Sequence, residues 1–393
     1  MKERKIICLF LCAALFIALA GCTGNPAATT VTTEQTQPTT QETTTETTAE
    51  TTVGYIDPSV TYHAPMAAVS LPTTVESSKA SNGTTLFTYT YQTMNLSLQD
   101  AMVADEILVE QLNRLDDANA SARALQAAAE AAYAGQENWE SYSFHLLYQP
   151  MRFDEMVLSL FATESIFDGN NRGNSANLSV TYDLLTGKPL GIRDVLVADY
   201  SAEDLVELIV QGLSEYEKQE LLFPDYRELI SDMFFTNRPV ENWYFTQEGL
   251  CFYFSPYEIA PYSSGTLVSS VPYESLSGLL KDSYFPAENV SFSGTPIVKD
   301  FTTADMDNIS RFAELILEKN APQKLLYAEG TLLNVRIESG AWSADGSEFT
   351  PQACVFAATA ISKGDAVMIQ CDDLSDLCLT YEAQGQVVSV PLK

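Results

Sequence analysis

Cys22 is the residue whose flanking sequence most clearly indicates a covalent modification. It follows a Leu-Ala-Gly tripeptide at positions 19–21, an apolar run at residues 6–18 and a basic start. Small residues before a cysteine suit a signal peptidase, and the thiol is the nucleophile that accepts a diacylglyceryl group. An ordinary secretory signal and an uncleaved anchor are the alternatives, but the run is shorter than a membrane-spanning helix requires. We therefore predict a lipoprotein signal peptide at residues 1–21 and lipidation of Cys22.

Lipidation of Cys22 would hold the protein at a membrane without a spanning segment. Each buried methylene of an acyl chain contributes about 0.8 kcal/mol, so two or three chains make release very slow. After the leader, no stretch has the roughly 18 uninterrupted apolar residues that a spanning helix requires. We expect everything after Cys22 to lie on the outer face of a bacterial cytoplasmic membrane, in the cell envelope.

Residues 22–53 have the composition of a tether. Between Thr23 and Val53 the chain contains 15 threonines, four glutamates and no lysine or arginine. Such a segment buries too little apolar surface to offset its ordering entropy. We expect a disordered spacer that lifts the folded part off the membrane, with O-glycosylation of its Thr-Glu-Thr-Thr repeats as the alternative role.

The residue types that common catalytic centres need are scarce. His63 and His145 are the only histidines, and the HExxH, GxSxG, SxxK and P-loop patterns are missing from the sequence. His145 lies in an aromatic, strand-like stretch, where a structural histidine is favoured over a general base. A carboxylate pair remains open, because 52 residues are acidic. We predict no catalytic residue, no metal site and no cofactor.

Two short segments have the composition of binding or redox loops. Residues 168–174 are rich in Asp, Asn and Gly, but Arg172 and the spacing differ from a calcium-binding EF-hand, which favours a surface turn. Outside the cytoplasm, Cys371 and Cys378 are close enough in sequence to close a small loop, and we predict a disulfide between them, with two free thiols as the alternative.

The elements that must position these residues alternate between strand and helix patterns. Apolar and polar residues that alternate predict strands, and apolar residues three and four apart predict helices. The predicted order is a strand at 87–91, a helix at 98–133, strands at 142–148, 156–161 and 178–182, a turn at 186–189 and a helix that Ser201 caps. We therefore expect an α+β fold, a mixed α/β arrangement with an antiparallel sheet and packed helices.

An aromatic block at residues 243–254 is the most specific pattern in the chain. Two aromatic runs flank a glycine-containing turn, which predicts a β-hairpin, and two prolines then direct the chain through residues 255–265. A proline-bounded loop presents aromatic rings at low entropy cost, so we predict that Tyr257, Glu258 and Tyr262 are exposed ligand-binding residues. The alternative is that these side chains pack in the core and fix the path of the chain.

A second folded unit is expected from residue 287 onwards. A helix is predicted at 303–319, and its inner face carries Ile309, Phe312, Ala313 and Ile316. Strand-like runs follow at 332–337, 353–361, 367–371 and 387–390. The predicted folded domains are thus an α+β domain at 54–286 and a small, β-rich domain at 287–393.

Two segments of the 54–286 domain resemble the RsiV-type extracellular sensor domain. One is Gly-Leu-Cys-Phe-Tyr-Phe-Ser-Pro-Tyr-Glu-Ile-Ala-Pro-Tyr-Ser-Ser-Gly at 249–265, followed by Val-Pro-Tyr at 271–273. The other is Val-Thr-Tyr-Asp-Leu-Leu-Thr-Gly-Lys-Pro-Leu at 180–190, with Asp-Val-Leu at 194–196. The family's known member is a membrane-spanning anti-sigma factor whose outer domain binds lysozyme. The resemblance implies a ligand-binding or sensor domain over about residues 84–285.

The chain also departs from this family. It resembles the sensor half alone, without a spanning helix or a cytoplasmic sigma-binding segment, so we do not expect it to hold a sigma factor. Relatives carry a glycine- and histidine-rich loop before the Tyr-Asp strand, whereas residues 168–174 contain no histidine. Functions tied to that loop are therefore not expected here.

The charge of the chain restricts its partners. The net charge is −31, and removal of the leader with its net +2 leaves −33. Such a field repels nucleic acid and attracts cationic proteins, although solubility alone is the alternative role of the charge. We predict a non-enzymatic, lipid-anchored protein that binds a cationic protein such as lysozyme or a cell-wall fragment. A wall polysaccharide-binding module is the second interpretation and a carboxylate-dependent wall-modifying hydrolase the third.

Overall fold

A computed structural model describes residues 67–136, 138–169, 173–213, 221–235, 241–286, 294–343, 346–383 and 386–392. These residues lie in one compact unit, Tyr62–Lys393. The predicted leader and tether, with Cys22, and also His63 lie outside the described residues. Within the described ranges, no helix is both long enough and apolar enough to cross a membrane.

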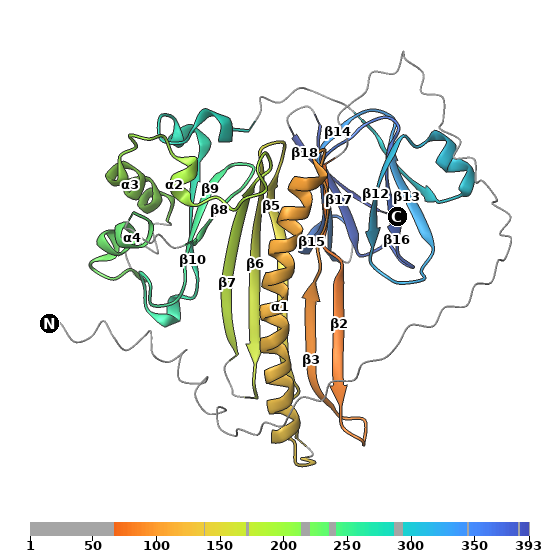
Figure 1. The fold of residues 1–393 in the computed structure, drawn as a ribbon, viewed down its shortest axis with the longest axis horizontal. Helices are drawn as coiled ribbons and strands as arrows, with labels where there is room; N and C mark the ends of the chain where they lie inside the picture. The colour runs from red at the N-terminus through yellow and green to blue at the C-terminus, as the bar shows by residue number, and fades with distance from the viewer. Residues whose placement is uncertain are drawn as a thin grey trace, which may run out of the picture. The chain divides into compact units, whose positions relative to one another are not determined.

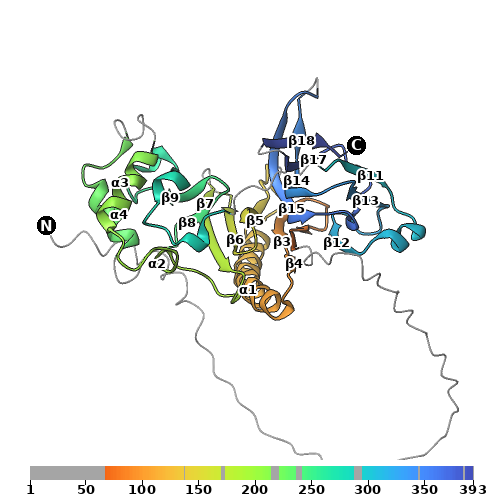
Figure 2. The ribbon, with the colours of Figure 1, turned by 90° about the horizontal axis from the view of Figure 1, so that it is seen from above.

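The first large element is a five-stranded sheet with the order β2-β3-β5-β6-β7. Strands β3 and β5 are parallel, because the long helix α1 connects them, and the other neighbours are antiparallel. Figures 1 and 2 show α1 against one face of this sheet. The bounds are β2 (Thr73–Lys79), β3 (Thr85–Gln92), α1 (Ala101–Ala132), β5 (Tyr142–Phe153), β6 (Val157–Phe167) and β7 (Asn174–Asp183).

Small side chains allow α1 to lie close to the sheet. Ala118, Ala122 and Ala129 are buried and belong to the core beneath the helix. A buried hydrogen bond also joins the two elements, because Gln111 Nε2 donates to the Tyr182 hydroxyl at 2.7 Å. The predicted helix at 98–133 and the three strands that follow it are confirmed.

The aromatic block forms the predicted hairpin within a three-stranded antiparallel sheet of order β10-β9-β8. Gly249 is required at its turn, because a Cβ there would lie 2.0 Å from the Val271 carbonyl oxygen. Ser201 caps helix α3 as predicted, since its hydroxyl accepts a hydrogen bond from the Asp204 N–H. The bounds are α2 (Ile192–Val195), α3 (Ala202–Gly212), α4 (Tyr226–Phe234), β8 (Trp243–Phe245), β9 (Gly249–Phe254) and β10 (Leu267–Pro272).

The C-terminal part consists of two sheets that share an apolar core. The six-stranded sheet has the order β18-β17-β14-β15-β1-β4, and the four-stranded sheet has the order β11-β13-β16-β12. The bounds are β1 (Ala68–Ser70), β4 (Asn95–Ser97), β11 (Pro296–Asp300), β12 (Arg311–Ile316), β13 (Gln323–Ala328), β14 (Leu332–Trp342), β15 (Phe349–Ile361), β16 (Asp365–Gln370), β17 (Leu377–Ala383) and β18 (Gln386–Pro391). The α+β class with a β-rich C-terminal part is confirmed.

The N-terminal strand β1 enters the sheet of the C-terminal part, where it pairs with β15 on one side and with β4 on the other. Residues on both sides of the predicted boundary at 286/287 therefore share one sheet. Short 3₁₀ helices complete the described structure at Tyr262–Ser264, Tyr273–Leu276, Asp282–Tyr284 and Thr303–Asn308. The boundary itself stays a prediction.

The predicted helix at 303–319 is wrong, because this stretch forms a short 3₁₀ helix followed by β12. Strand β12 pairs with β16 in parallel, and the Arg311 guanidinium contacts the buried Asp365 carboxylate at 2.9 Å. Leu315 is buried, whereas Phe312 and Ile316 are exposed. The apolar spacing thus suited a helix, but tertiary pairing with β16 outweighed the local preference.

Arg152 of β5 joins the five-stranded sheet to the three-stranded sheet of β8, β9 and β10, which we call the aromatic sheet. It is 0% exposed, and its Nε atom contacts the Asp154 carboxylate at 2.5 Å. Its Nη1 atom donates to the Tyr273 hydroxyl and to the Tyr284 carbonyl, both at 2.6 Å. The guanidinium carbon lies 5.0 Å from the centre of the Phe245 ring. A buried cation thus finds its partners on four separate segments.

We predict that Arg152→Met lowers the free energy of unfolding by about 3–5 kcal/mol, because it leaves the partly buried Asp154 carboxylate and the buried Tyr284 carbonyl without their cation. Tyr273→Phe removes one hydrogen bond and should cost about 1–2 kcal/mol. Urea unfolding of the purified chain measures both values. Arg123→Met, on the exposed side of α1, is the matched control. Equal effects of the substitutions at 152 and 123 would contradict the role of Arg152.

Candidate functional site

Tyr257 and Tyr262 lie together on the loop between β9 and β10. They are 66% and 48% exposed, and their ring centres are 5.7 Å apart with 36° between the ring planes. The two side chains therefore form one small aromatic surface that is about half exposed or more at each residue. This is the exposed arrangement that the ligand-binding interpretation requires, and the binding itself stays a prediction.

Glu258 differs from the expectation of an exposed contact residue. Its carboxylate accepts hydrogen bonds from the Ser255 N–H at 2.6 Å and from Asn242 Nδ2 at 3.2 and 3.3 Å. Burial raises the pKa of this carboxyl, and the two donors act against that rise. Glu258 therefore closes the base of the loop and ties it to Asn242, the residue before β8.

The backbone at Tyr257 is strained. Its φ angle is 73°, in the left-handed region that a bulky residue rarely adopts. The conformation is held from both sides, because the Tyr257 N–H donates to the Ala260 carbonyl and the neighbouring Ile259 and Ala260 are buried. Strain of this kind costs of order 1–3 kcal/mol and is concentrated at functional sites. We therefore take this loop as the candidate site.

The loop is anchored to the helices as well as to the sheet. The Phe223 N–H, just before α4, donates to the Ile259 carbonyl at 2.9 Å. On the other side, Asn177 Nδ2 of β7 donates to the Thr266 hydroxyl at 3.0 Å. The aromatic pair is thus presented on a fixed base, which lowers the entropy that a ligand would have to remove on binding.

His145 lies in β5 between Thr90 of β3 and Ser165 of β6. Burial lowers the pKa of its imidazole. Within the described part of the chain, no group of three or more His, Cys, Asp and Glu side chains is arranged to hold a metal ion. In the surface turn predicted at 168–174, residues 170–172 lie outside the described residues.

The predicted disulfide between Cys371 and Cys378 is not formed. Both cysteines are free and buried. The Cys371 thiol donates to the Asp373 carbonyl at 2.9 Å, and the Cys378 thiol lies 3.8 Å from the Leu379 carbonyl. Cys378 belongs to β17, which pairs with β14 and β18, so its side chain direction is set by the sheet and not by the loop.

A model of a protein family matches part of this region. A model of the DUF3298 family, described as a protein of unknown function, matches residues 193–274. This range includes α3, α4, β8–β10 and the loop at 255–266 that carries Tyr257 and Tyr262, which we call the tyrosine loop. None of the curated proteins compared with the chain matches it.

Two solved structures are similar to the chain. A crystal structure of a DUF3298 family member from Bacteroides fragilis NCTC 9343 is 17% identical with a TM-score of 0.40, and the match covers 56% of this chain and 96% of that one. A DUF3298 family protein from Pseudomonas aeruginosa PAO1 is 19% identical with a TM-score of 0.37, and the match covers 56% and 98% of the two chains.

We predict that Tyr257→Gly raises the free energy of unfolding by about 1 kcal/mol, because glycine adopts a φ of 73° without strain. Tyr262→Gly is the control on the same loop, since Tyr262 lies in a 3₁₀ helix where glycine should lower stability by about 0.5–1 kcal/mol. Chemical denaturation of the two variants measures the effects. A loss of stability in both variants would show that the Tyr257 conformation is not strained.

Proposed function

We propose that this chain is a non-enzymatic, lipid-anchored extracytoplasmic lipoprotein whose RsiV-type domain binds a ligand, with a cationic protein such as lysozyme as that ligand. The observation that carries the proposal is the exposed pair of Tyr257 and Tyr262 on a strained and anchored loop. Rigid tyrosines bury a large area at low entropy cost and are enriched among the residues that dominate binding energy.

Three further observations support this proposal. The RsiV-type motif at 249–265 contains both tyrosines, and the DUF3298 match at 193–274 encloses the same loop. The net charge of −31 attracts a cationic partner and accelerates its encounter. The leader that ends in Leu-Ala-Gly directly before Cys22 would place the domain outside the membrane, where such partners occur.

A wall polysaccharide is the second candidate ligand, and the aromatic pair also favours it. Exposed rings stack on the apolar faces of sugars, and this contact needs no charge. The two ligands therefore differ in their response to salt, because screening weakens a charge-steered protein complex and leaves ring stacking largely unchanged.

We predict that Cys22→Ala leaves the chain with its leader or releases it into the medium, because the thiol that would receive the lipid is gone. Cell fractionation with metabolic fatty-acid labelling measures the outcome, and Cys12→Ala, within the apolar run of the leader, is the matched control. A cleaved, unlabelled product that still fractionates with membranes would contradict lipid anchoring.

We predict that lysozyme binds the chain made from residue 23 to residue 393 and that the affinity falls steeply above physiological salt, where the Debye length is below about 8 Å. Tyr257→Ala and Tyr262→Ala should each weaken binding about tenfold, mainly through faster dissociation. Leu185→Ala, at a side chain that is 67% exposed, is the control. Calorimetry at low and high salt measures the affinities.

Two results would overturn the lysozyme proposal. One is the absence of heat at low salt and high micromolar concentration, and the other is an equal effect of the substitutions at 185, 257 and 262. Binding of purified peptidoglycan that persists at high salt and requires the two tyrosines would place the polysaccharide ligand first.

A further inference from the structure

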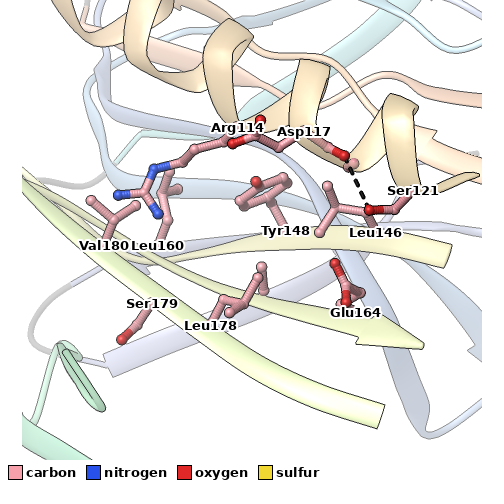
Figure 3. A pocket seen from close by; sticks show the side chains of 12 residues that line it. Arg114, Asp117, Ser121, Leu146, Tyr148, Leu160, Glu164, Leu178, Ser179 and Val180 are labelled. Carbon is pink, nitrogen blue, oxygen red and sulfur yellow. Dashed lines mark hydrogen bonds between the residues drawn. The ribbon is translucent and has the colours of Figure 1, made fainter. Parts of the chain in front are cut away.

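A groove of about 210 Å³ lies between α1 and the sheet strands β5, β6 and β7. Figure 3 shows its lining: α1 contributes Arg114, Asp117 and Ser121 from one side, and the strands contribute Tyr148 and Glu164 from the other. Protein interiors are close-packed, so an open volume of this size beneath a helix calls for a physical explanation.

The groove stays open where α1 places small side chains above the sheet. Ala118 and Ser121 line the groove from α1, whereas the opposite wall is formed by larger apolar residues of the sheet, including Leu146, Leu160 and Leu178. Leu160 is 0% exposed, while Leu178 is 40% exposed. The apolar wall thus runs from the core to the solvent, as a site for an aliphatic chain would.

Glu164 is the one charged residue that the strands contribute to the lining of this groove. It pairs across the sheet with Leu146 on one side and Ala176 on the other, and burial raises its pKa. Within the described residues, its carboxylate has no hydrogen-bond or ion-pair partner. A carboxylate that is partly buried without a partner carries a desolvation cost. A cation bound beside it would pair with its charge and offset that cost.

Arg114 does not supply this cation. Its Nε and Nη2 atoms donate to Glu110 Oε1 at 3.2 and 2.9 Å, so its charge is already paired on the helix. Figure 3 shows Arg114 at one end of the groove and Glu164 at the other, beneath Ser121. With Arg114 neutralised by Glu110, the unpaired charges in the groove are the carboxylates of Glu164 and Asp117. The groove therefore has an apolar wall and an anionic end.

We propose that this groove binds an alkylammonium group, with the aliphatic chain along Leu146 and Leu178 and the ammonium at Glu164. The group could come from a free polyamine or from a lysine side chain of a peptide, and both present methylenes that end in an ammonium. This site is separate from the tyrosine loop and does not depend on the function proposed for that loop.

Calorimetric titration of the chain from residue 23 to residue 393 with hexylammonium tests the proposal. We expect a dissociation constant of about 1 mM or tighter, and no binding of hexanoate, which has the same chain with the opposite charge. Glu164→Gln should weaken binding at least tenfold without lowering the unfolding midpoint, because it removes a partly buried unpaired charge. Glu314→Gln, on the exposed side of β12, should bind like the parent chain.

Two probes distinguish the sources of the ammonium. One is spermidine, and the other is a peptide whose N-terminus is acetylated and whose single lysine keeps its free side-chain ammonium. The probe that binds more tightly, with the same dependence on Glu164, identifies the source, and either result supports the site. Three results overturn it: no binding of hexylammonium at 10 mM or below, an affinity for hexanoate equal to that for hexylammonium, or equal effects of Glu164→Gln and Glu314→Gln. Tyr257→Ala should leave hexylammonium binding unchanged, which separates this test from that of the tyrosine loop.

Discussion

The buried guanidinium of Arg152 is the interaction on which the arrangement of the N-terminal half depends. A cation with no exposed surface must find all of its partners inside the protein, and these come from the end of β5, from the segment after β10 and from the 3₁₀ turn near residue 284. Loss of the charged member of a buried ion pair costs several kcal/mol. The contacts of Arg152 therefore couple the unfolding of the five-stranded sheet to the unfolding of the aromatic sheet.

The contact between the two sheets through Arg152 determines the position of the tyrosine loop. Strand β9 is buried along its whole length, and the loop begins directly after it. Because the aromatic sheet is fixed to β5 through Arg152 and packs on β6 and β7, the start of the loop has a defined position. Glu258 then ties the first turn of the loop to Asn242. The strain at Tyr257 persists because the surrounding contacts outweigh its cost.

Sequence patterns predicted the elements that depend on near neighbours. The helical spacing at 98–133, the aromatic hairpin and the Ser201 cap are all set by residues within a few positions of one another. Arg152 gave no such signal, since its partners Tyr273 and Tyr284 are 121 and 132 residues away. The inward turn of Glu258 was missed for the same reason, because Asn242 lies 16 residues earlier. The strand at 311–316 was mistaken for a helix because its pairing partner β16 lies more than fifty residues later.

The distribution of cations explains why both candidate sites would attract positive charge. The chain has 21 Lys and Arg against 52 Asp and Glu. Several of these cations have partners within the fold: Arg152 is enclosed by four segments, Arg114 pairs with Glu110, and Arg311 pairs with Asp365. The excess of carboxylates is therefore left to the surface and to the groove. Such a field accelerates the approach of any cation without selecting one. Selection must then come from uncharged features, which are the paired rings at one site and the apolar wall at the other.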